Sequence, residues 1–305
     1  MPLYQSYYLI KLYVMKQGRV LLISRPNVGK STFLNNLISQ KVSITSPKPQ
    51  TTRFPIKALY QDERGDIIFI DTPGLMRKTE DLLSENINKK TLQTLNEELD
   101  LVLYMVDPTR KRDFEEARVL GLVRQIEKPK ILVLNKIDLL QTGKKDDYSA
   151  QYKFLEEEFS DVFYISALKK LHFKPLIKRI FELLPEKKEE KFENLNPYPV
   201  LNIDAKTFVA ELIREKVFLM MGEEIPYTTT AIVDEIDERK NGVIYIKARI
   251  LTNNDRYKKM LIGKEGRKIK EIGSYARKEI VLATGKKVYL DLQVETDPHW
   301  MEIYF

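Results

Sequence analysis

The pattern of apolar and polar positions predicts alternating strands and helices over the first 184 residues. Short apolar runs predict strands at residues 20–23, 56–61, 66–70, 101–106, 130–134 and 162–165. Segments with helical periodicity predict helices at residues 32–38, 82–99, 114–127, 148–159 and 174–184. Such alternation gives a mostly parallel sheet, covered on both faces, that binds its ligand at the carboxyl ends of the strands. Residues 62–65 predict a hairpin turn, so the two strands beside it should be antiparallel.

The pattern changes after residue 184. Residues 185–199 combine a run of charges with several prolines, which marks a linker. Beyond it we expect helix, strand, strand, helix, helix and strand, at residues 205–219, 228–237, 243–251, 255–261, 267–284 and 288–294. The 305 residues are therefore predicted to hold an N-terminal extension (1–14), an α/β domain (15–184), the linker (185–199) and a smaller α+β domain (200–305).

A candidate phosphate-binding loop follows the first apolar run. The residues that we expect to contact a nucleotide there are Ser24, Arg25, Pro26, Asn27, Val28, Gly29, Lys30, Ser31 and Thr32. A loop between a strand and a helix directs backbone N–H groups and the positive end of the helix at one place. Gly29 lets the backbone approach phosphate closely, Lys30 reaches the terminal phosphates, and the Ser31 hydroxyl can bind Mg²⁺.

Ser24 departs from the motif, which reads G-x-x-x-x-G-K-[ST] and has a glycine at this place. If the position requires a positive φ, the serine Cβ strains the loop. A chance Gly-Lys-Ser turn is the alternative interpretation, and further motifs in the expected order argue against it.

Two more motifs follow predicted strands. Asp71 can hold Mg²⁺ through water and the N–H of Gly74 can contact a γ-phosphate, although a plain Asp-Thr-Pro-Gly turn is the alternative.

Asn135, Lys136 and Asp138 follow a later strand, and the Asp138 carboxylate can accept two hydrogen bonds from guanine that adenine cannot offer. A site of this kind rejects the wrong base by as much as ~10⁴, which favours GTP and GDP over ATP.

The residues after the next predicted strand complete this set. A backbone N–H of Ser166 or Ala167 can meet the carbonyl oxygen of guanine. Alone, these two residues say little about function. They indicate a guanine site only because they follow the other motifs in order.

A basic glycine loop lies between two predicted helices of the second domain. The residues that we expect to bind RNA are Ile262, Gly263, Lys264, Glu265, Gly266, Arg267, Lys268 and Lys270. A G-x-x-G loop at a helix corner can press its backbone against the phosphates of single-stranded RNA, as KH domains do. The alternative is a simple helix corner, in which glycine serves the turn alone.

Composition narrows the classes of function. The formal net charge of +7 and the pI near 9.1 favour a polyanionic partner. The chain has no cysteine, which excludes disulfides, thiolate zinc sites and a cysteine nucleophile. Its two histidines are too few and too far apart for a metal cluster, and no apolar run reaches the roughly 20 residues of a membrane span. We expect a cytoplasmic protein.

The four motifs in this order resemble those of translation-factor-class GTPases, and residues 25–31 with 50–53 resemble the Era family in particular. The resemblance implies that Thr52 closes on Mg²⁺ and the γ-phosphate. It also implies that Leu75 stands where other GTPases carry a water-orienting glutamine, and that Asn27 binds K⁺. Catalysis would then rest on Asn27, Lys30 and Thr52, with Mg²⁺ held by Ser31, Thr52 and Asp71. Stabilisation of the loop is the alternative role for Asn27.

The resemblance extends over both domains and implies a P-loop GTPase domain followed by a type II KH domain. It implies a monomeric GTPase that binds 16S rRNA, assists maturation of the small ribosomal subunit and associates peripherally with the membrane. One alternative is a nucleotide-gated RNA-binding protein with little hydrolysis. A metabolic P-loop kinase is another, although it would not need Asn135 and Asp138 to read guanine.

Overall fold

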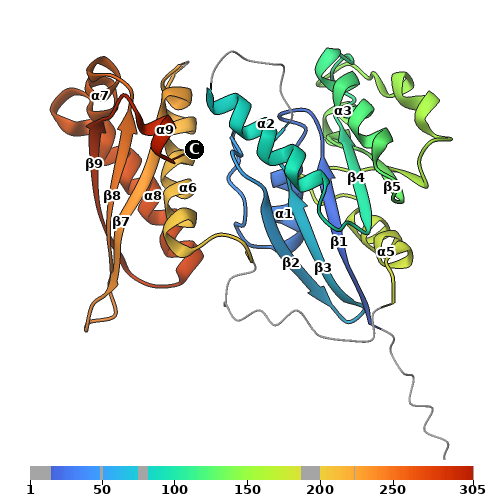
Figure 1. Ribbon diagram of the computed structural model, residues 1–305, viewed down its shortest axis with the longest axis horizontal. Coiled ribbons are helices and arrows are strands. Elements are labelled where there is room, and N and C mark those ends of the chain that lie inside the picture. The colour runs from blue at the N-terminus through green and yellow to red at the C-terminus, as the bar shows by residue number, and fades with distance from the viewer. Residues whose placement is uncertain (1–14, 49–50, 75–81, 187–199, 223, 305) are drawn as a thin grey trace, which may run out of the picture.

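The computed structural model describes residues 15–48, 51–74, 82–186, 200–222 and 224–304, which form two domains side by side (Figure 1). The predicted N-terminal extension and most of the predicted linker lie outside the described residues. Among the described helices, none combines the length and the apolar character needed to cross a bilayer.

A six-stranded sheet organises the first domain, with strand order β2-β3-β1-β4-β5-β6. The hairpin pair β2–β3 is antiparallel and the other neighbours are parallel, which confirms the predicted mixed, mostly parallel sheet. The strands are β1 (Lys16–Ile23), β2 (Ile56–Asp62), β3 (Gly65–Asp71), β4 (Leu101–Val106), β5 (Lys130–Leu134) and β6 (Asp161–Tyr164).

Helices cover both faces because the central strands are apolar on both. All six residues of β4 are buried, and alternate residues of β1 enter two separate cores. The first core includes side chains of α1 (Lys30–Ile38) and α5 (Phe173–Leu183), and the second includes side chains of α3 (Phe114–Gln125). The other helices are α2 (Leu82–Leu95) and α4 (Ile137–Gln141).

The helix predicted at residues 148–159 is a shorter 3₁₀ helix, η1 (Ser149–Leu155). Three glutamates, residues 156–158, would stand in the last turn of the longer helix. Negative charge is unfavourable there because it faces the negative end of the helix dipole.

The second domain packs three helices against one face of a three-stranded sheet. Strands β7 and β8 are antiparallel, and β8 and β9 are parallel. The elements are α6 (Ala205–Met220), η2 (Ile225–Thr228), β7 (Thr229–Glu238), β8 (Ile244–Thr252), α7 (Asp255–Ile262), η3 (Lys264–Gly266), α8 (Arg267–Thr284), β9 (Val288–Thr296) and α9 (Trp300–Tyr304). The predicted α-β-β-α-α-β order of a small α+β domain is confirmed.

Candidate functional site

The phosphate-binding loop, residues 24–29, connects β1 to the first turn of α1. Gly29 precedes the helix with φ 108° and ψ 23°, in the left-handed region that favours glycine. A Cβ at Gly29 would lie 2.5 Å from Nδ2 of Asn135. Glycine is therefore needed here both for its backbone conformation and for the close approach of a side chain from the end of β5.

The carbonyl oxygens of this loop are bound by side chains from neighbouring strand ends. Three donors act on successive carbonyls: Arg110 on Pro26 at 3.1 Å, Lys136 on Asn27 at 2.7 Å and Asn135 on Val28 at 2.8 Å. With the carbonyls occupied in this way, the N–H groups of the loop and of the first turn of α1 remain to bind an anion.

Lys136 is in turn held by a carboxylate that sequence analysis missed. Its Nζ lies 2.7 Å from Oδ2 of Asp107, which directly follows β4. Burial alone would raise the pKa of Asp107, but Lys136 and hydrogen bonds from Thr109 bring the pKa below its usual value. The rule that ligand-binding residues follow parallel strands could have found Asp107, whereas no local motif marks Arg110.

Ser24 does not take the left-handed conformation, so the expected strain does not arise. Its Oγ donates to the carbonyl oxygen of Arg25 at 2.6 Å and accepts from Nζ of Lys30 at 2.8 Å. Burial lowers the pKa of Lys30, and the nearby Asp71 opposes this change.

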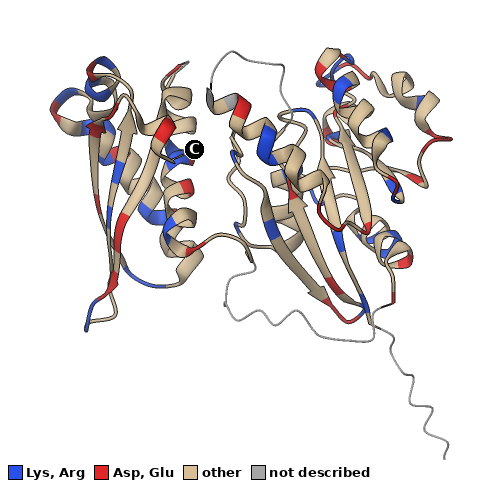
Figure 2. Cartoon of the chain, viewed as in Figure 1, with Lys and Arg blue, Asp and Glu red and all other residues tan. Residues whose placement is uncertain are grey.

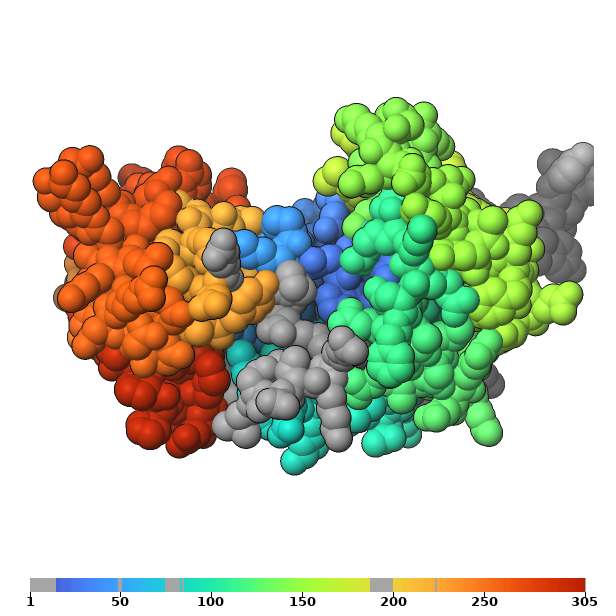
Figure 3. Space-filling view, turned by 90° about the horizontal axis from the view of Figure 1, so that it is seen from above, coloured from blue at the N-terminus to red at the C-terminus, as the bar shows by residue number. Residues whose placement is uncertain are grey.

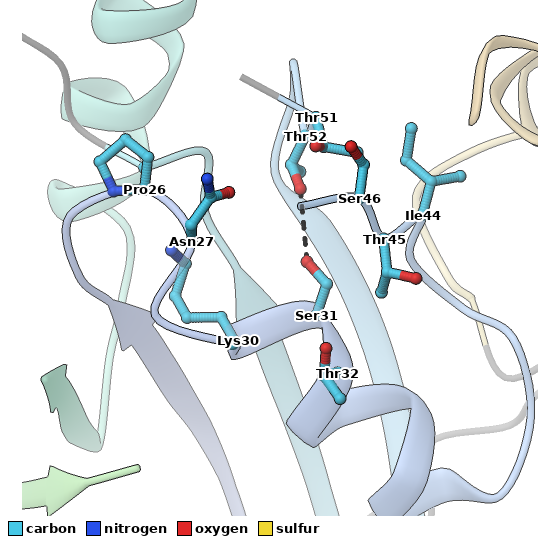
Figure 4. Close-up of a pocket in the computed structure, with 12 residues that line it drawn as sticks. Pro26, Asn27, Lys30, Ser31, Thr32, Ile44, Thr45, Ser46, Thr51 and Thr52 are labelled. Atoms are coloured by element: carbon cyan, nitrogen blue, oxygen red, sulfur yellow. Dashed lines mark hydrogen bonds between the residues drawn. The ribbon is translucent and has the colours of Figure 1, made fainter. Parts of the chain in front are cut away.

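Three oxygen-bearing side chains meet where the sequence predicts Mg²⁺. Oγ of Ser31 donates to Oδ2 of Asp71 at 2.7 Å. It also lies 3.3 Å from Oγ1 of Thr52, the contact that Figure 4 marks with a dashed line. Oδ1 of Asp71 is buried and has no hydrogen-bond partner among the described residues. Hydroxyl and carboxylate oxygens are hard ligands, so this set fits Mg²⁺. Ser43, which was not predicted, also donates to Oδ2 of Asp71 at 2.9 Å.

Residues 44–46 and 51–52 line the side of this pocket opposite the phosphate-binding loop (Figure 4). We call residues 41–53 the switch segment; residues 49–50 of it, and Leu75, lie outside the described residues. Nδ2 of Asn27 donates to the carbonyl oxygen of Pro47 at 2.8 Å, which joins the loop to the switch segment. Pro26, Thr32 and Gly74 also line the pocket.

Besides Ser24, two residues of the loop that were predicted to contact the nucleotide have side chains that do not line this pocket. Arg25 is only 2% exposed, and its Nη1 lies 2.7 Å from Asp113 and its Nε 3.1 Å from Glu116, at the start of α3. Val28 is buried in the first core. Both residues can therefore contact a nucleotide only through their backbone.

The residues predicted to read guanine lie together at the ends of β5 and β6. Oγ of Ser166 donates to Oδ1 of Asp138 at 2.5 Å, which orients the carboxylate. The N–H of Ala167 donates to Oδ1 of Asn135 at 2.8 Å. The N–H of Ala167 is thus already bonded within the protein. The sequence led us to expect that an N–H of Ser166 or Ala167 would meet the carbonyl oxygen of guanine.

The basic loop of the second domain turns between α7 and α8. Gly263, Glu265 and Gly266 all have positive φ, at 71°, 55° and 72°. A Cβ at Gly263 would lie 2.7 Å from Cβ of Lys268, whereas a Cβ at Gly266 would meet nothing within 4 Å. The backbone at Gly266 therefore faces open space, where a phosphate could approach.

Acidic residues alternate with basic ones along this loop and the helices beside it (Figure 2). Arg267 pairs with Glu265 at 2.8 Å and Lys268 with Glu271 at 3.0 Å. Lys264, Arg267 and Lys270 are exposed, and Ile262 is half-buried against the core of the second domain. Positive charge is thus less concentrated around the loop than the predicted residue set implies.

Comparisons with known proteins agree with the fold of both domains. Residues 19–136 match the family described as 50S ribosome-binding GTPase, and residues 224–301 match the KH domain. GTPase Era of Thermotoga petrophila is 40% identical over 291 residues, which cover 94% of each chain. GTPase Era of Halothermothrix orenii is 38% identical over 287 residues, which cover 94% of this chain and 95% of the relative.

Two solved structures cover nearly the whole chain. A single-residue variant of Aquifex aeolicus Era bound to GDP·AlF₄⁻ is 33% identical with a TM-score of 0.85, covering 94% of this chain and 96% of that one. Era in complex with MgGDPNP and nucleotides 1506–1542 of 16S ribosomal RNA is 34% identical with a TM-score of 0.84, covering 94% and 95%. With this degree of identity along almost its entire length, the chain belongs to the Era family of GTPases.

Proposed function

We propose that this GTP-hydrolysing enzyme is a switch that binds the 3′ region of 16S rRNA and assists maturation of the small ribosomal subunit. The similar Era structure with MgGDPNP and nucleotides 1506–1542 of 16S rRNA supports the choice of RNA. The observation that carries the proposal is the position of the switch segment, which contacts both the nucleotide pocket and the KH domain.

Helix α6 binds the first part of the switch segment through a buried carboxylate. Oε1 of Glu215 accepts from Nζ of Lys41 at 2.6 Å and from the N–H of Thr45 at 2.7 Å. Burial would raise the pKa of Glu215, but Lys41 and the hydrogen bonds of Lys216 and Thr45 bring it below its usual value. Glu215 is therefore a charged anchor at neutral pH. Figure 3 shows the gold atoms of α6 beside the lighter blue atoms that follow α1.

The second part of the switch segment is bound on both sides of Thr52. Nη2 of Arg214 donates to the carbonyl oxygen of Thr51, and Nη2 of Arg53 donates to the carbonyl oxygen of Thr229 at 3.0 Å. The neighbours of the predicted Mg²⁺ ligand are thus attached to the KH domain. In this structure Thr52 already lies beside Ser31 while these bonds are made. When Thr52 leaves the metal site after hydrolysis, its neighbours must therefore either move the KH domain or lose these bonds.

A second contact joins α2 to the KH domain. Leu83 and Ile87 of α2 form one buried cluster with Leu251 of β8 and Trp300 of α9. Because α2 follows the segment that contains Gly74, a change at the γ-phosphate has two routes to the KH domain. GTP can shift the equilibrium between two arrangements of the KH domain only by its difference in affinity for these two arrangements.

In hydrolysis, Lys30 would bind the terminal phosphates and offset their negative charge, and Ser31, Thr52 and Asp71 would hold the metal ion. Bound Mg²⁺ would neutralise charge on the β- and γ-phosphate oxygens. The described residues that line the pocket include no carboxylate or histidine that could serve as a general base. Catalysis therefore rests on position and electrostatics.

We infer that K⁺ supplies part of that charge beside Asn27. Nδ2 of Asn27 donates to the carbonyl oxygen of Pro47, which leaves Oδ1 of Asn27 for a cation, and amide and carbonyl oxygens are the ligands that suit K⁺. We also infer a monomer in the cytoplasm. Peripheral membrane association stays a prediction from the resemblance.

The proposed function is tested by measuring RNA affinity and GTP turnover together. An RNA of nucleotides 1506–1542, the segment in the similar Era complex, should bind more tightly to the protein with GDPNP than with GDP, and a shuffled RNA of equal length should bind weakly in both states. Equal affinity for the two RNAs would contradict the rRNA assignment. Equal affinity in the two nucleotide states would contradict the switch.

A further inference from the structure

Ser24 gives the phosphate-binding loop a side chain that the motif does not include. The glycine of the motif offers no side-chain acceptor, whereas Oγ of Ser24 accepts from Nζ of Lys30 at 2.8 Å. Ser24 is fully buried and Lys30 is 7% exposed, so water competes little for this contact.

The contact also fixes the direction in which the hydroxyl points. Oγ of Ser24 uses its single proton to donate to the carbonyl oxygen of Arg25 at 2.6 Å. Its lone pairs are then left for Lys30, and an ammonium group has three donors. One donor can stay on Ser24 while the other two bind the β- and γ-phosphates.

We propose that Ser24 is a positioning residue for Lys30, which its hydroxyl holds in line with the terminal phosphates. The proposal rests on the predicted role of Lys30 toward GTP. A lysine with one donor already directed loses less side-chain entropy when phosphate binds. The gain in nucleotide affinity from Ser24 should grow with the number of phosphates that Lys30 reaches. The affinity for GTP should therefore depend on Ser24 more than the affinity for GDP does.

The test compares Ser24→Ala and Ser24→Gly with the parent in the full chain. Both variants should bind GDPNP about tenfold more weakly and turn over GTP about tenfold more slowly, as expected for one hydrogen bond to a charged group. Their GDP affinity should change less than about threefold. The Lys30→Ala single variant and the Ser24→Ala/Lys30→Ala double variant should bind GDPNP equally, because Ser24 acts through Lys30.

Five outcomes would count against the proposal, four of them through Ser24 and one through Lys30. Parent-like GDPNP affinity in Ser24→Ala would remove the role of the hydroxyl. A Ser24→Gly protein that is faster than the parent would make the serine a steric defect. Equal losses of GDP and GDPNP affinity would mean that Ser24 only supports the loop. The same would follow if Ser24→Ala still weakened GDPNP binding in a protein that already carries Lys30→Ala. Failure of the Lys30→Ala variant to weaken GDPNP would refute the underlying role of Lys30, independently of Ser24.

Discussion

At the scale of single residues, Asn135 shapes three parts of the nucleotide site. Its Nδ2 binds the carbonyl of Val28, its Oδ1 accepts from the N–H of Ala167, and the side chain stands where a Cβ of Gly29 would lie. The asparagine of the guanine motif thus ties the base-reading loops to the phosphate-binding loop. An alanine at Gly29 would disturb all of them.

Asp138 should decide the choice of base. We expect Asp138→Asn to weaken GTP binding and to favour xanthosine triphosphate, because an amide donor matches the xanthine carbonyl where a carboxylate repels it. Ser166 can still bind the amide oxygen, so the side chain should keep its orientation. Competition of both triphosphates against a fluorescent nucleotide measures the preference, and an unchanged preference would remove Asp138 from the base site.

Asn27 should set the response to monovalent cations. If K⁺ binds beside Asn27 and Pro47, GTP turnover should be faster in K⁺ than in Na⁺ at equal ionic strength. Asn27→Ala should abolish that difference. Equal rates of the parent protein in both salts would leave Asn27 only its hydrogen bond to the switch segment, which is the alternative role.

At the scale of elements, the loop between α7 and α8 has a matched counterpart at the other end of α8. Gly266 and Gly285 both have positive φ, at 72° and 67°, and a Cβ at either would meet nothing within 4 Å. A substitution at either glycine carries the same backbone strain. Only Gly266 belongs to the predicted RNA-binding loop.

Gly266→Asp should therefore cost on the order of 2–3 kcal/mol of RNA affinity, because it adds a negative charge and a side chain beside phosphate. Gly285→Asp should bind RNA like the parent with a similar loss of thermal stability. GTP affinity should be unchanged in both. Filter binding and thermal unfolding give the comparison, and equal RNA affinity of the two variants would reduce the loop to a helix corner.

At the scale of the whole molecule, the switch segment couples the two domains through α6. Glu215→Gln keeps the shape of the side chain but removes the charge that Lys41 and Thr45 bind. The ratio of RNA affinity with GDPNP to that with GDP should fall toward one, from a coupling that is typically about 1–3 kcal/mol.

Arg249→Gln is the control for this variant. Arg249 pairs with Asp234 and Glu295 within the KH sheet, so its ion pairs lie inside one domain. The variant should preserve the affinity ratio while losing some stability. A Glu215→Gln protein with the parental ratio would show that the coupling runs through α2 or another contact.

The sequence by itself determined the sheet, the order of the nucleotide motifs and the KH topology. These features are local, because each strand, loop and helix start follows the one before it along the chain. The strands and helices are marked by their periodicity and the loops by their glycines. The hairpin at residues 62–65 and the need for glycine at position 29 are likewise local features. The helix expected at residues 148–159 was wrong in type, since the glutamates at its end oppose the dipole of an α-helix of that length.

Only the tertiary structure decided which residues hold these motifs in place. Arg110 reaches the phosphate-binding loop from the segment after β4, Asp107 of the same segment holds Lys136, and Ser43 joins Asp71 from the switch segment. Arg214 and Thr51 meet although 163 positions separate them along the chain. Such pairs leave no local pattern, because nothing in the neighbouring residues of either partner depends on the other until both domains have folded and met.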